Sequence, residues 1–244
     1  MAALTADRVS VRYPGQAQPA LDGVSLNVGP GELAVALGPS GCGKTTLLNL
    51  FAGFQFPDSG SVRFGGAPVA GPGAERAVVF QQHALLPWLS ALDNVAFGLR
   101  LRGVPRAERR ELAGRALAQV DLAEAGARYP WQLSGALLMD EPFGALDAFN
   151  REQMQELLLK VWAESGSSVF LITHDIEEAL FLATELVLMS PGPGRIVKTL
   201  RPPFSRRWRA GDSARAIKSD PEFIALREQL LADVFAQRKQ EAWA

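Results

Sequence analysis

The sequence predicts an α/β fold in which helices flank a mostly parallel sheet and a smaller antiparallel sheet lies near the N-terminus. Short apolar runs at Leu33–Leu37 and 169–173 are typical of strands buried on both faces. Helical patterns lie between such runs, and this alternation predicts parallel strands with helices packed on the sheet. Residues 3–13 and 20–28 instead alternate polar and apolar side chains with turn residues between them, which indicates an antiparallel pair.

The helical segments are expected at Lys44–Ala52, 105–120, 149–164 and 175–183. The first should end at Gly53, because glycine readily takes the left-handed conformation that closes a helix. Pro105 suits the first position of the second helix, where its missing N–H is not needed. Apolar residues recur at one-face spacing in the second and third helices, at Ala113, Ala116, Leu117 and Val120 and at Met154, Leu157, Leu158 and Val161.

The composition narrows the class of protein. With 48% hydrophobic and 21% charged residues, the 244-residue chain is ordinary for one substantial globular domain. The net charge of −1 gives no reason to expect nucleic acid or an anionic membrane as a partner. The single cysteine, Cys42, excludes an internal disulfide and suits a reducing compartment. Since the sequence has neither a secretory leader pattern nor an apolar run of about 18 residues, we expect a soluble, cytosolic protein.

Residues 38–45 carry a phosphate-binding pattern, G-x-x-x-x-G-K-[ST], between a buried strand and a helix. Its members are Gly38, Pro39, Ser40, Gly41, Cys42, Gly43, Lys44 and Thr45, and Thr46 is counted with them as an expected ATP contact. Glycines let the loop turn backbone N–H groups around phosphate oxygens, and the following helix adds its positive N-terminal end. Lys44 can reach the β- and γ-phosphates, and the Thr45 hydroxyl can ligate Mg²⁺. A glycine-rich turn that binds nothing is the alternative, but the place of the pattern favours a nucleoside triphosphate.

Two further strand ends carry polar groups. An apolar run from residue 136 ends in Asp140 and Glu141, and the run at 169–173 ends in His174. Ligands of open α/β sheets bind at the carboxyl ends of the strands. Asp140 is therefore placed to hold Mg²⁺ through water, Glu141 to polarise an attacking water, and His174 to contact the γ-phosphate. An acidic pair or a single histidine is a weak sign by itself, but beside the phosphate loop the three residues are a strong one.

With these motifs in place, the chain resembles the ATP-binding cassette family along almost its whole length. The resemblance is carried by the stretches GPGAERAVVFQQHALLPW, DNVAFGL, MDEPFGALDAF, THDIEEA and SARAIKSDPEFIALRE. Within the family the chain is similar to the group of taurine, sulfonate and nitrate importers. The resemblance implies a P-loop nucleoside triphosphatase core, an N-terminal antiparallel β-subdomain and a helical subdomain.

The resemblance also implies roles for individual residues. Tyr13 matches the aromatic that stacks on adenine, although an ordinary tyrosine at a strand end would look the same. Gln81 matches the glutamine that contacts the metal and the γ-phosphate and senses the membrane subunits. Ser134 and Gly135 match the opening of the signature sequence, which binds the γ-phosphate held by an opposite subunit. Asp147 belongs to the loop that crosses the dimer interface.

On this resemblance the chain is one nucleotide-binding domain that uses ATP and Mg²⁺, with Glu141 and the switch histidine His174 as catalytic residues. Two copies are expected to close head to tail around ATP. They should drive transmembrane permease subunits at the cytoplasmic face of the membrane, with a solute-binding protein as an indirect partner. The expected parts are a β-subdomain at about 1–30 and 58–70, a core at about 31–57, 71–84 and 136–200, a helical subdomain at about 85–135 and a C-terminal helical extension at about 210–244.

One departure from the family concerns the signature. In the family a second glycine, a glutamine and an arginine-bearing helix precede the metal-binding strand, whereas here Ser134-Gly135 is followed at once by residues 136–140. About 17 residues are missing, which corresponds to four or five helical turns. The helical subdomain should therefore be shortened. A cassette that binds ATP but is deficient in hydrolysis is the alternative to an active importer ATPase.

Other classes of nucleotide-binding protein fit less well. Non-transport cassettes that act on DNA or ribosomes carry long coiled-coil insertions or two cassettes per chain, and the sequence shows neither. Small GTPases and P-loop kinases are disfavoured because the N-K-x-D motif is absent and the signature remnant has no place in them. Taurine or a related sulfonate as the transported solute follows from the likeness alone, since the ATPase does not touch the solute.

Overall fold

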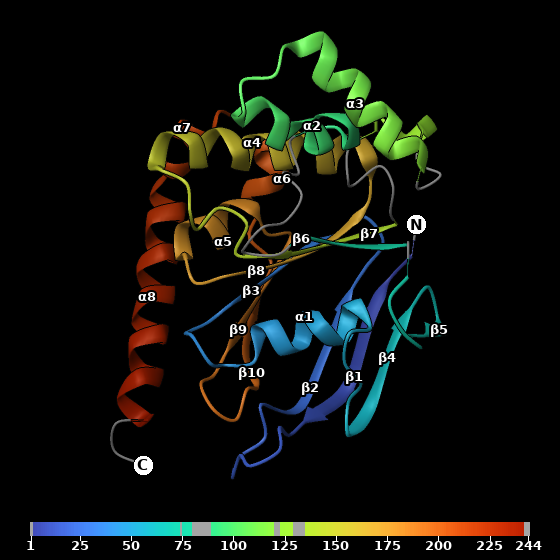
Figure 1. The fold of residues 1–244 in the computed structure, drawn as a ribbon. Coiled ribbons are helices and arrows are strands. Elements are labelled where there is room, and N and C mark those ends of the chain that lie inside the picture. The colour runs from blue at the N-terminus through green and yellow to red at the C-terminus, as the bar shows by residue number, and fades with distance from the viewer. Residues whose placement is uncertain (1, 74, 80–88, 120–122, 129–134, 242–244) are drawn as a thin grey trace.

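The computed structural model describes residues 2–73, 75–79, 89–119, 123–128 and 135–241, and this described part is an α/β fold with two sheets (Figure 1). The larger sheet has the strand order β10-β9-β3-β8-β7-β6, and the smaller has the order β2-β1-β4-β5. The larger sheet contains β3 Leu33–Leu37, β6 Arg76–Val79, β7 Ala136–Asp140, β8 Ser168–Thr173, β9 Glu185–Met189 and β10 Ile196–Leu200. The smaller contains β1 Leu4–Val11, β2 Leu21–Val28, β4 Ser59–Phe64 and β5 Ala67–Pro68.

The larger sheet is parallel except at one edge, as the alternation of strands and helices predicts. β3 runs parallel to β8 and β9, and β7 runs parallel to β8 and β6, whereas β10 pairs antiparallel with β9. Along β3 the side chains alternate between two cores, with Leu33, Val35 and Leu37 in one and Ala34 and Ala36 in the other. Because both faces are covered, every residue of β3 is buried, which explains its unbroken apolar sequence.

Helices cover both faces of this sheet (Figure 1). On one face α1 (Lys44–Ala52) packs between the two sheets through Leu47, Leu48, Leu50 and Phe51. The other face is covered by α4 (Ala148–Ser165), α5 (Ile176–Leu182), α6 (Phe204–Arg209), α7 (Ala214–Lys218) and α8 (Pro221–Glu241). The C-terminal helices are fixed to this core by an edge-to-face pair, Phe204 and Phe223, whose ring centroids are 4.8 Å apart.

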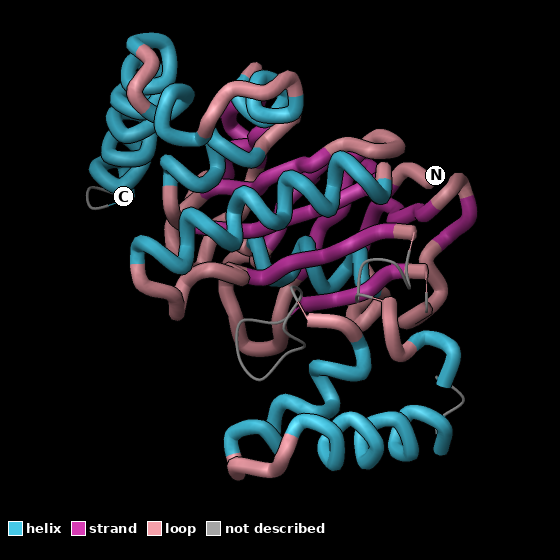
Figure 2. Tube along the Cα trace, turned by 90° about the horizontal axis from the view of Figure 1, so that it is seen from above, coloured by secondary structure: helices cyan, strands magenta, loops and turns pink. Residues whose placement is uncertain are grey.

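Two helices, α2 (Ala91–Leu101) and α3 (Arg106–Gln119), form an arm that extends away from the sheets, at the bottom of Figure 2. A short 3-10 turn, η1 (Ala123–Ala125), follows α3. α2 begins where the Ser90 hydroxyl accepts a hydrogen bond from the backbone N–H of Asp93 at 3.1 Å. The two helices bury only Ala96, Ala113 and Leu117, so apolar packing stabilises this arm less than it stabilises the sheets.

The expected helix Lys44–Ala52 is confirmed at both ends as α1. It closes at Gly53, which has a φ of 79°. In α4, Leu158 and Val161 are buried as expected. Leu159 and Trp162 are also buried, although they do not belong to the apolar set predicted from the sequence. These two extra residues are buried because α4 packs against a broad sheet and so turns a wide apolar face inward.

Two expectations for α3 are wrong. The helix begins at Arg106, and Pro105 precedes it and accepts a hydrogen bond from the N–H of Arg109 at 3.0 Å. Ala116 is exposed, because α3 packs on α2 rather than on the sheet and needs only a narrow apolar face. Val120, the last residue of the expected apolar set, lies outside the described residues.

The first prediction concerns the contact between α1 and the sheet. Phe170 of β8 and Phe51 of α1 are fully buried and meet edge to face, with ring centroids 5.0 Å apart. We expect Phe170→Ala to lower the free energy of unfolding by about 3–5 kcal/mol, because lost transfer energy and a new cavity add. Urea denaturation measures this loss. Phe56→Ala, at a residue that is 58% exposed, is the control and should stay within about 0.5 kcal/mol. Equal losses in the free energy of unfolding for the two variants would contradict the assignment of Phe170 to the core between α1 and the sheet.

Candidate nucleotide-binding site

The loop between β3 and α1 has the tight geometry that its glycines predict. Gly43, the last residue before α1, has a φ of 91°, which side chains rarely adopt. A Cβ at this position would also lie 2.6 Å from the carbonyl oxygen of Ala20. Glycine is therefore required for α1 to begin directly behind the loop, where the first turn of the helix leaves its N–H groups available.

Lys44 lies inside the loop rather than in solvent. Its Nζ donates hydrogen bonds to the carbonyl oxygens of Gly38 at 2.7 Å and Pro39 at 2.8 Å, and the residue is 6% exposed. The Cys42 sulfur is 3.7 Å from the same Nζ, and burial raises the pKa of the Cys42 thiol although the nearby ammonium lowers it. Neutral carbonyls do not compensate the positive charge of Lys44, so this charge is available to an anion.

A cavity of about 540 Å³ opens beside the loop, which is within the range of small-molecule sites. It is lined by Tyr13, Gln16, Gln18, Pro19, Ala20, Ser40, Gly41, Gly43, Lys44, Thr45, Thr46, Asp140, Glu141 and Gly192. The structure thus brings nine of the expected site residues to one cavity. Five lining residues were missed by the sequence prediction, namely Gln16, Gln18, Pro19, Ala20 and Gly192. They belong to loops without a motif, and proximity to Tyr13 in the chain was the one available signal for four of them.

Tyr13 is fixed at the edge of this cavity by its hydroxyl group. The hydroxyl donates to the side-chain oxygen of Gln55 at 2.9 Å and lies 3.2 Å from the Thr46 hydroxyl. The ring is therefore tied to α1 and to the segment that follows it. A half-buried aromatic ring at the mouth of a polar cavity can stack on a planar base, as the sequence predicts.

Asp140 lies at the carboxyl end of β7, opposite the start of α1. The Thr45 hydroxyl donates to its carboxylate at 3.3 Å. Burial raises the pKa of Asp140, the hydrogen bond from Thr45 lowers it, and the nearby Glu141 raises it further. A hydroxyl and a carboxylate are the oxygen ligands that Mg²⁺ prefers, and a bound cation would offset the cost of burying Asp140 as an anion. These two residues therefore fit the expected metal.

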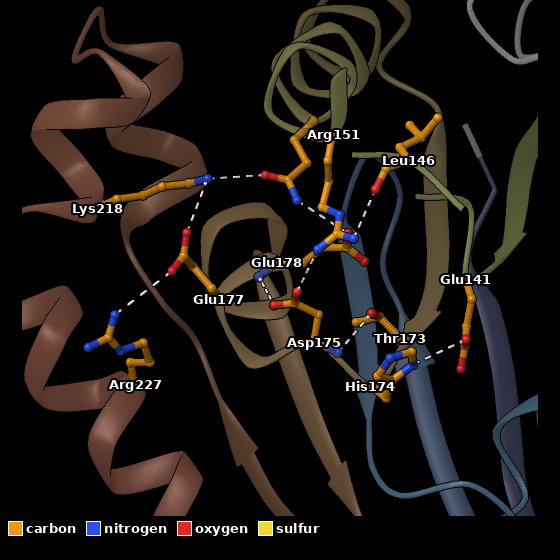
Figure 3. Close-up of polar contacts among 11 residues, drawn as sticks. Glu141, Leu146, Arg151, Thr173, His174, Asp175, Glu177, Glu178, Lys218 and Arg227 are labelled. Carbon is orange, nitrogen blue, oxygen red and sulfur yellow. Dashed lines mark hydrogen bonds and ion pairs between the residues drawn. The ribbon is translucent and has the colours of Figure 1, made fainter. Parts of the chain in front are cut away.

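Glu141 and His174 are in direct contact, at the ends of the neighbouring strands β7 and β8 (Figure 3). The Glu141 Oε2 is 3.1 Å from the His174 Nδ1, and the side chains are 17% and 61% exposed, respectively. Glu141 has a φ of 43°, an uncommon conformation, and its N–H donates to the carbonyl oxygen of Ile172 at 2.9 Å. Such conformations persist only where the surroundings impose them, and here the adjacent strand holds the backbone.

Asp147 lies at the end of an exposed loop and caps α4. Its carboxylate accepts a hydrogen bond from the N–H of Asn150 at 3.0 Å. Hydrogen bonds from the backbone and side chain of Asn150 lower the pKa of Asp147. The loop is also tied back to the cavity, because the N–H of Gly144 donates to the carbonyl oxygen of Glu141 at 3.1 Å. Asp147 thus has a local structural role besides the interface role that the sequence predicts.

The signature remnant does not join the cavity within the described part of the chain. Gly135 directly precedes β7, and its N–H and that of Ala136 both donate to the carbonyl oxygen of Glu75 at 2.9 Å. Gly135 thus lies at the amino end of β7, about 16 Å along the strand from Asp140. Ser134 and Gln81 lie outside the described residues.

Glu178 is a titratable residue that the sequence prediction missed. It lies on α5, is 4% exposed and accepts a hydrogen bond from the Gln155 side chain at 3.2 Å. Burial raises the pKa of Glu178 to about 7, although hydrogen bonds from Thr173 and Gln155 lower it. No motif marks this residue, because its burial arises only when α5 packs against α4.

Comparison with known proteins agrees with this site. The ABC transporter profile matches residues 21–143. The taurine import ATP-binding protein TauB of Chromobacterium violaceum is 93% identical over 261 aligned positions, covering 100% of both chains. TauB of Pseudomonas entomophila is 59% identical over 259 positions, covering 99% of this chain and 100% of the relative. This chain belongs to the ABC transporter family.

A solved structure supports the same assignment for this ABC transporter chain. It is a dimeric ATP-binding cassette in a post-hydrolysis state, bound to ADP and Pi. The match has a TM-score of 0.59 and 27% sequence identity, and covers 81% of this chain and 98% of the other. The predicted α/β cassette fold is thereby confirmed.

The alignment with the Chromobacterium relative also bears on chain length. Its 261 positions contain all 244 residues of this ABC transporter chain, so 17 positions have no residue here. Since 93% of 261 positions is about 243, nearly every residue that is present is identical to its counterpart. The two proteins therefore differ almost entirely by absent residues.

The described residues of this ABC transporter chain include neither a membrane-spanning helix nor a metal cluster made of side chains alone. Among them, no helix combines the length and apolarity that a membrane crossing requires. Nor do they contain a cluster of three or more His, Cys, Asp or Glu residues that could ligate a metal without other groups. The expected Mg²⁺ site differs from such a cluster, because it combines one hydroxyl, one carboxylate and the phosphates of a nucleotide.

The second prediction concerns Glu178. A carboxyl whose pKa is raised in the folded state adds stability that is fully present below its unfolded pKa of 4.5 and is lost as the pH rises through about 7. We therefore expect Glu178→Gln to be more stable than the parent at pH 8, by about 3 kcal/mol at most, and equal to it near pH 4.5. Thermal unfolding across this pH range measures the effect. Glu164→Gln, at an exposed residue of α4, should not alter the pH profile. If the stability of Glu178→Gln and that of the parent differ by the same amount at every pH, the prediction is contradicted.

Proposed function

We propose that this chain is the ATP-binding subunit of an importer for taurine or a related sulfonate. The single observation that carries the proposal is the phosphate loop with a buried Lys44, beside a cavity of about 540 Å³ that Tyr13, Thr45 and Asp140 also line. The solute follows from likeness, because the relatives named above are taurine import proteins. The solute itself would not enter this cavity.

The residues in and beside the cavity have different roles in ATP binding and hydrolysis. Loop N–H groups and Lys44 bind the phosphates, and Tyr13 stacks on the adenine. Thr45 and Asp140 would hold Mg²⁺, which neutralises phosphate charge when bound. Glu141 accepts a proton from the attacking water, and His174, in contact with Glu141, orients that water and the γ-phosphate. Gln81 is assigned to the metal on the family resemblance.

The partners follow from the same assignment. Two copies would close head to tail around ATP, as the family resemblance implies, and the solved cassette with ADP and Pi is likewise dimeric. Asp147, exposed at the end of its loop, is available to such an interface. Permease subunits in the membrane would then receive the closing motion at the cytoplasmic face, with a solute-binding protein delivering the solute on the other side. Nucleic acid is not expected as a partner.

A second candidate, a cassette that binds ATP without efficient hydrolysis, is favoured by the short signature. The 17 unmatched positions equal the length expected to be missing after Gly135, and Gly135 enters β7 directly. A helix after Gly135 would have offered its N-terminus to the phosphate of the second copy.

The third prediction tests binding. Lys44→Ala should weaken Mg·ATP binding about tenfold or more, because charge-assisted hydrogen bonds are worth about 1.5–3 kcal/mol each. Isothermal titration of ATP measures the change. Lys160→Ala, at an exposed lysine of α4, is the matched control and should bind as the parent does. Equal ATP affinities of Lys44→Ala and the parent would contradict the assignment of Lys44 to phosphate binding.

The fourth prediction tests hydrolysis. Inserting after Gly135 a family-like signature segment of about 17 residues should raise the steady-state ATPase rate at least about 100-fold, since contacts made in the transition state are worth this much. ATP affinity should change little, because the cavity is formed by other segments. An insertion of the same length made only of glycine and serine is the control, and it should leave the ATPase rate at the value of the parent. If the protein without the insertion already hydrolyses ATP as fast as the protein with it, the second candidate is excluded.

A further inference from the structure

Arg151 connects two loops that carry expected functional residues. It lies in the first turn of α4, and its guanidinium donates to the Leu146 carbonyl at 3.1 Å and to the Asp175 carboxylate at 3.4 Å (Figure 3). Leu146 belongs to residues 144–147, hereafter the interface loop. Asp175 belongs to residues 173–175, hereafter the switch turn, which contains His174. Since one planar group reaches both loops, movement of either one strains the other contact.

Apart from the Glu141–His174 contact, the switch turn is also held by two short-range hydrogen bonds. The N–H of Asp175 donates to the Thr173 hydroxyl at 3.0 Å, and the Asp175 carboxylate accepts from the N–H of Glu178 at 3.0 Å, which caps α5. These bonds shape the turn but do not connect it to α4 or to the interface loop. The Arg151–Asp175 contact makes that connection. Arg151 also lines a small cavity of about 40 Å³ together with Glu141 and His174.

A second polar layer supports Arg151 from behind. Gln155 lies one helical turn further along α4, and it donates to Glu178 at 3.2 Å and accepts from Lys218 of α7 at 3.3 Å. Lys218 also pairs with Glu177 of α5 at 3.3 Å. α4 and α5 are thus joined by two adjacent polar contacts. Only the one made by Arg151 reaches the loops that carry Asp147 and His174.

We propose that Arg151 is a positioning residue that holds the interface loop and the switch turn in one arrangement, so that His174 faces Glu141 only when both loops are in place. The proposal rests on the ATPase function proposed above. Through this link, contact of the interface loop with a second copy would set the orientation of His174. Arg151 acts through Asp175 and Leu146 and does not itself reach the cavity that the nucleotide would occupy.

The test uses the two histidines of the chain, His83 and His174, as magnetic resonance probes. The full-length protein is labelled at its histidine rings, and His174→Gln identifies the His174 signals. We expect Arg151→Met and Asp175→Asn each to shift or broaden these signals by more than a linewidth, and the double variant to add nothing further. Arg115→Met, which removes an exposed ion pair with Glu111, is the matched control and should leave them unchanged.

The second measurement is turnover in the protein with the restored signature segment. There Arg151→Met should lower kcat about 10- to 100-fold while KM stays within about twofold, because misplacing a catalytic group affects the reaction rather than binding. Arg151→Lys should recover part of the loss. A structural role alone would lower thermal stability and leave the His174 signals and kcat unchanged.

Unchanged His174 signals in folded Arg151→Met would overturn the proposal. If Arg151→Met does not fold, Asp175→Asn decides, because it keeps the arginine and the helix cap. ATP titration of the parent tests the proposed function separately. A parent that fails to bind ATP would therefore not be confused with a failure of the Arg151 contact.

Discussion

The nucleotide cavity depends on the parallel pairing of β3, β8 and β7. Because these neighbouring strands run in the same direction, their carboxyl ends bring the phosphate loop, His174 and the Asp140-Glu141 pair to one edge of the sheet. The sheet is buried on both faces, by α1 with the antiparallel sheet and by α4 to α8. Asp140 and Glu141, for example, directly follow the buried apolar residues of β7.

The short signature affects a different part of the molecule. Gly135 lies at the amino end of β7, whereas Asp140 and Glu141 lie at the carboxyl end of the same strand. β7 itself pairs with β6 and β8, so the strand is formed although Gly135 directly precedes it. If the proposed ATPase acts as a pair of copies, the residues that the resemblance expects after Gly135 would belong to the surface that the second copy meets. On that proposal, nucleotide binding within one chain would be separable from hydrolysis between two chains.

Polar contacts, rather than apolar ones alone, join α4 and α5 close to the cavity. Arg151 contacts Asp175, and Gln155 contacts Glu178, which is buried. Buried polar groups are costly unless they are paired, and the raised pKa of Glu178 reflects this cost. Their geometry is also more directional than apolar packing, which suits a position between two loops that must keep a fixed relation.

The sequence by itself determined the local features. The phosphate loop, the buried strand β3, the bounds of α1 and the strand ends at Asp140 and His174 follow from spacing along the chain, because glycine conformation, helix closure and apolar runs are set by neighbouring residues. Only the tertiary structure decided the contacts between distant segments. The Glu141–His174 contact, the anchoring of Tyr13 by Gln55, the burial of Glu178 and the two partners of Arg151 join residues brought together by sheet order and helix packing. Residue spacing within one element does not predict such contacts, since they arise from the way separate elements pack in three dimensions.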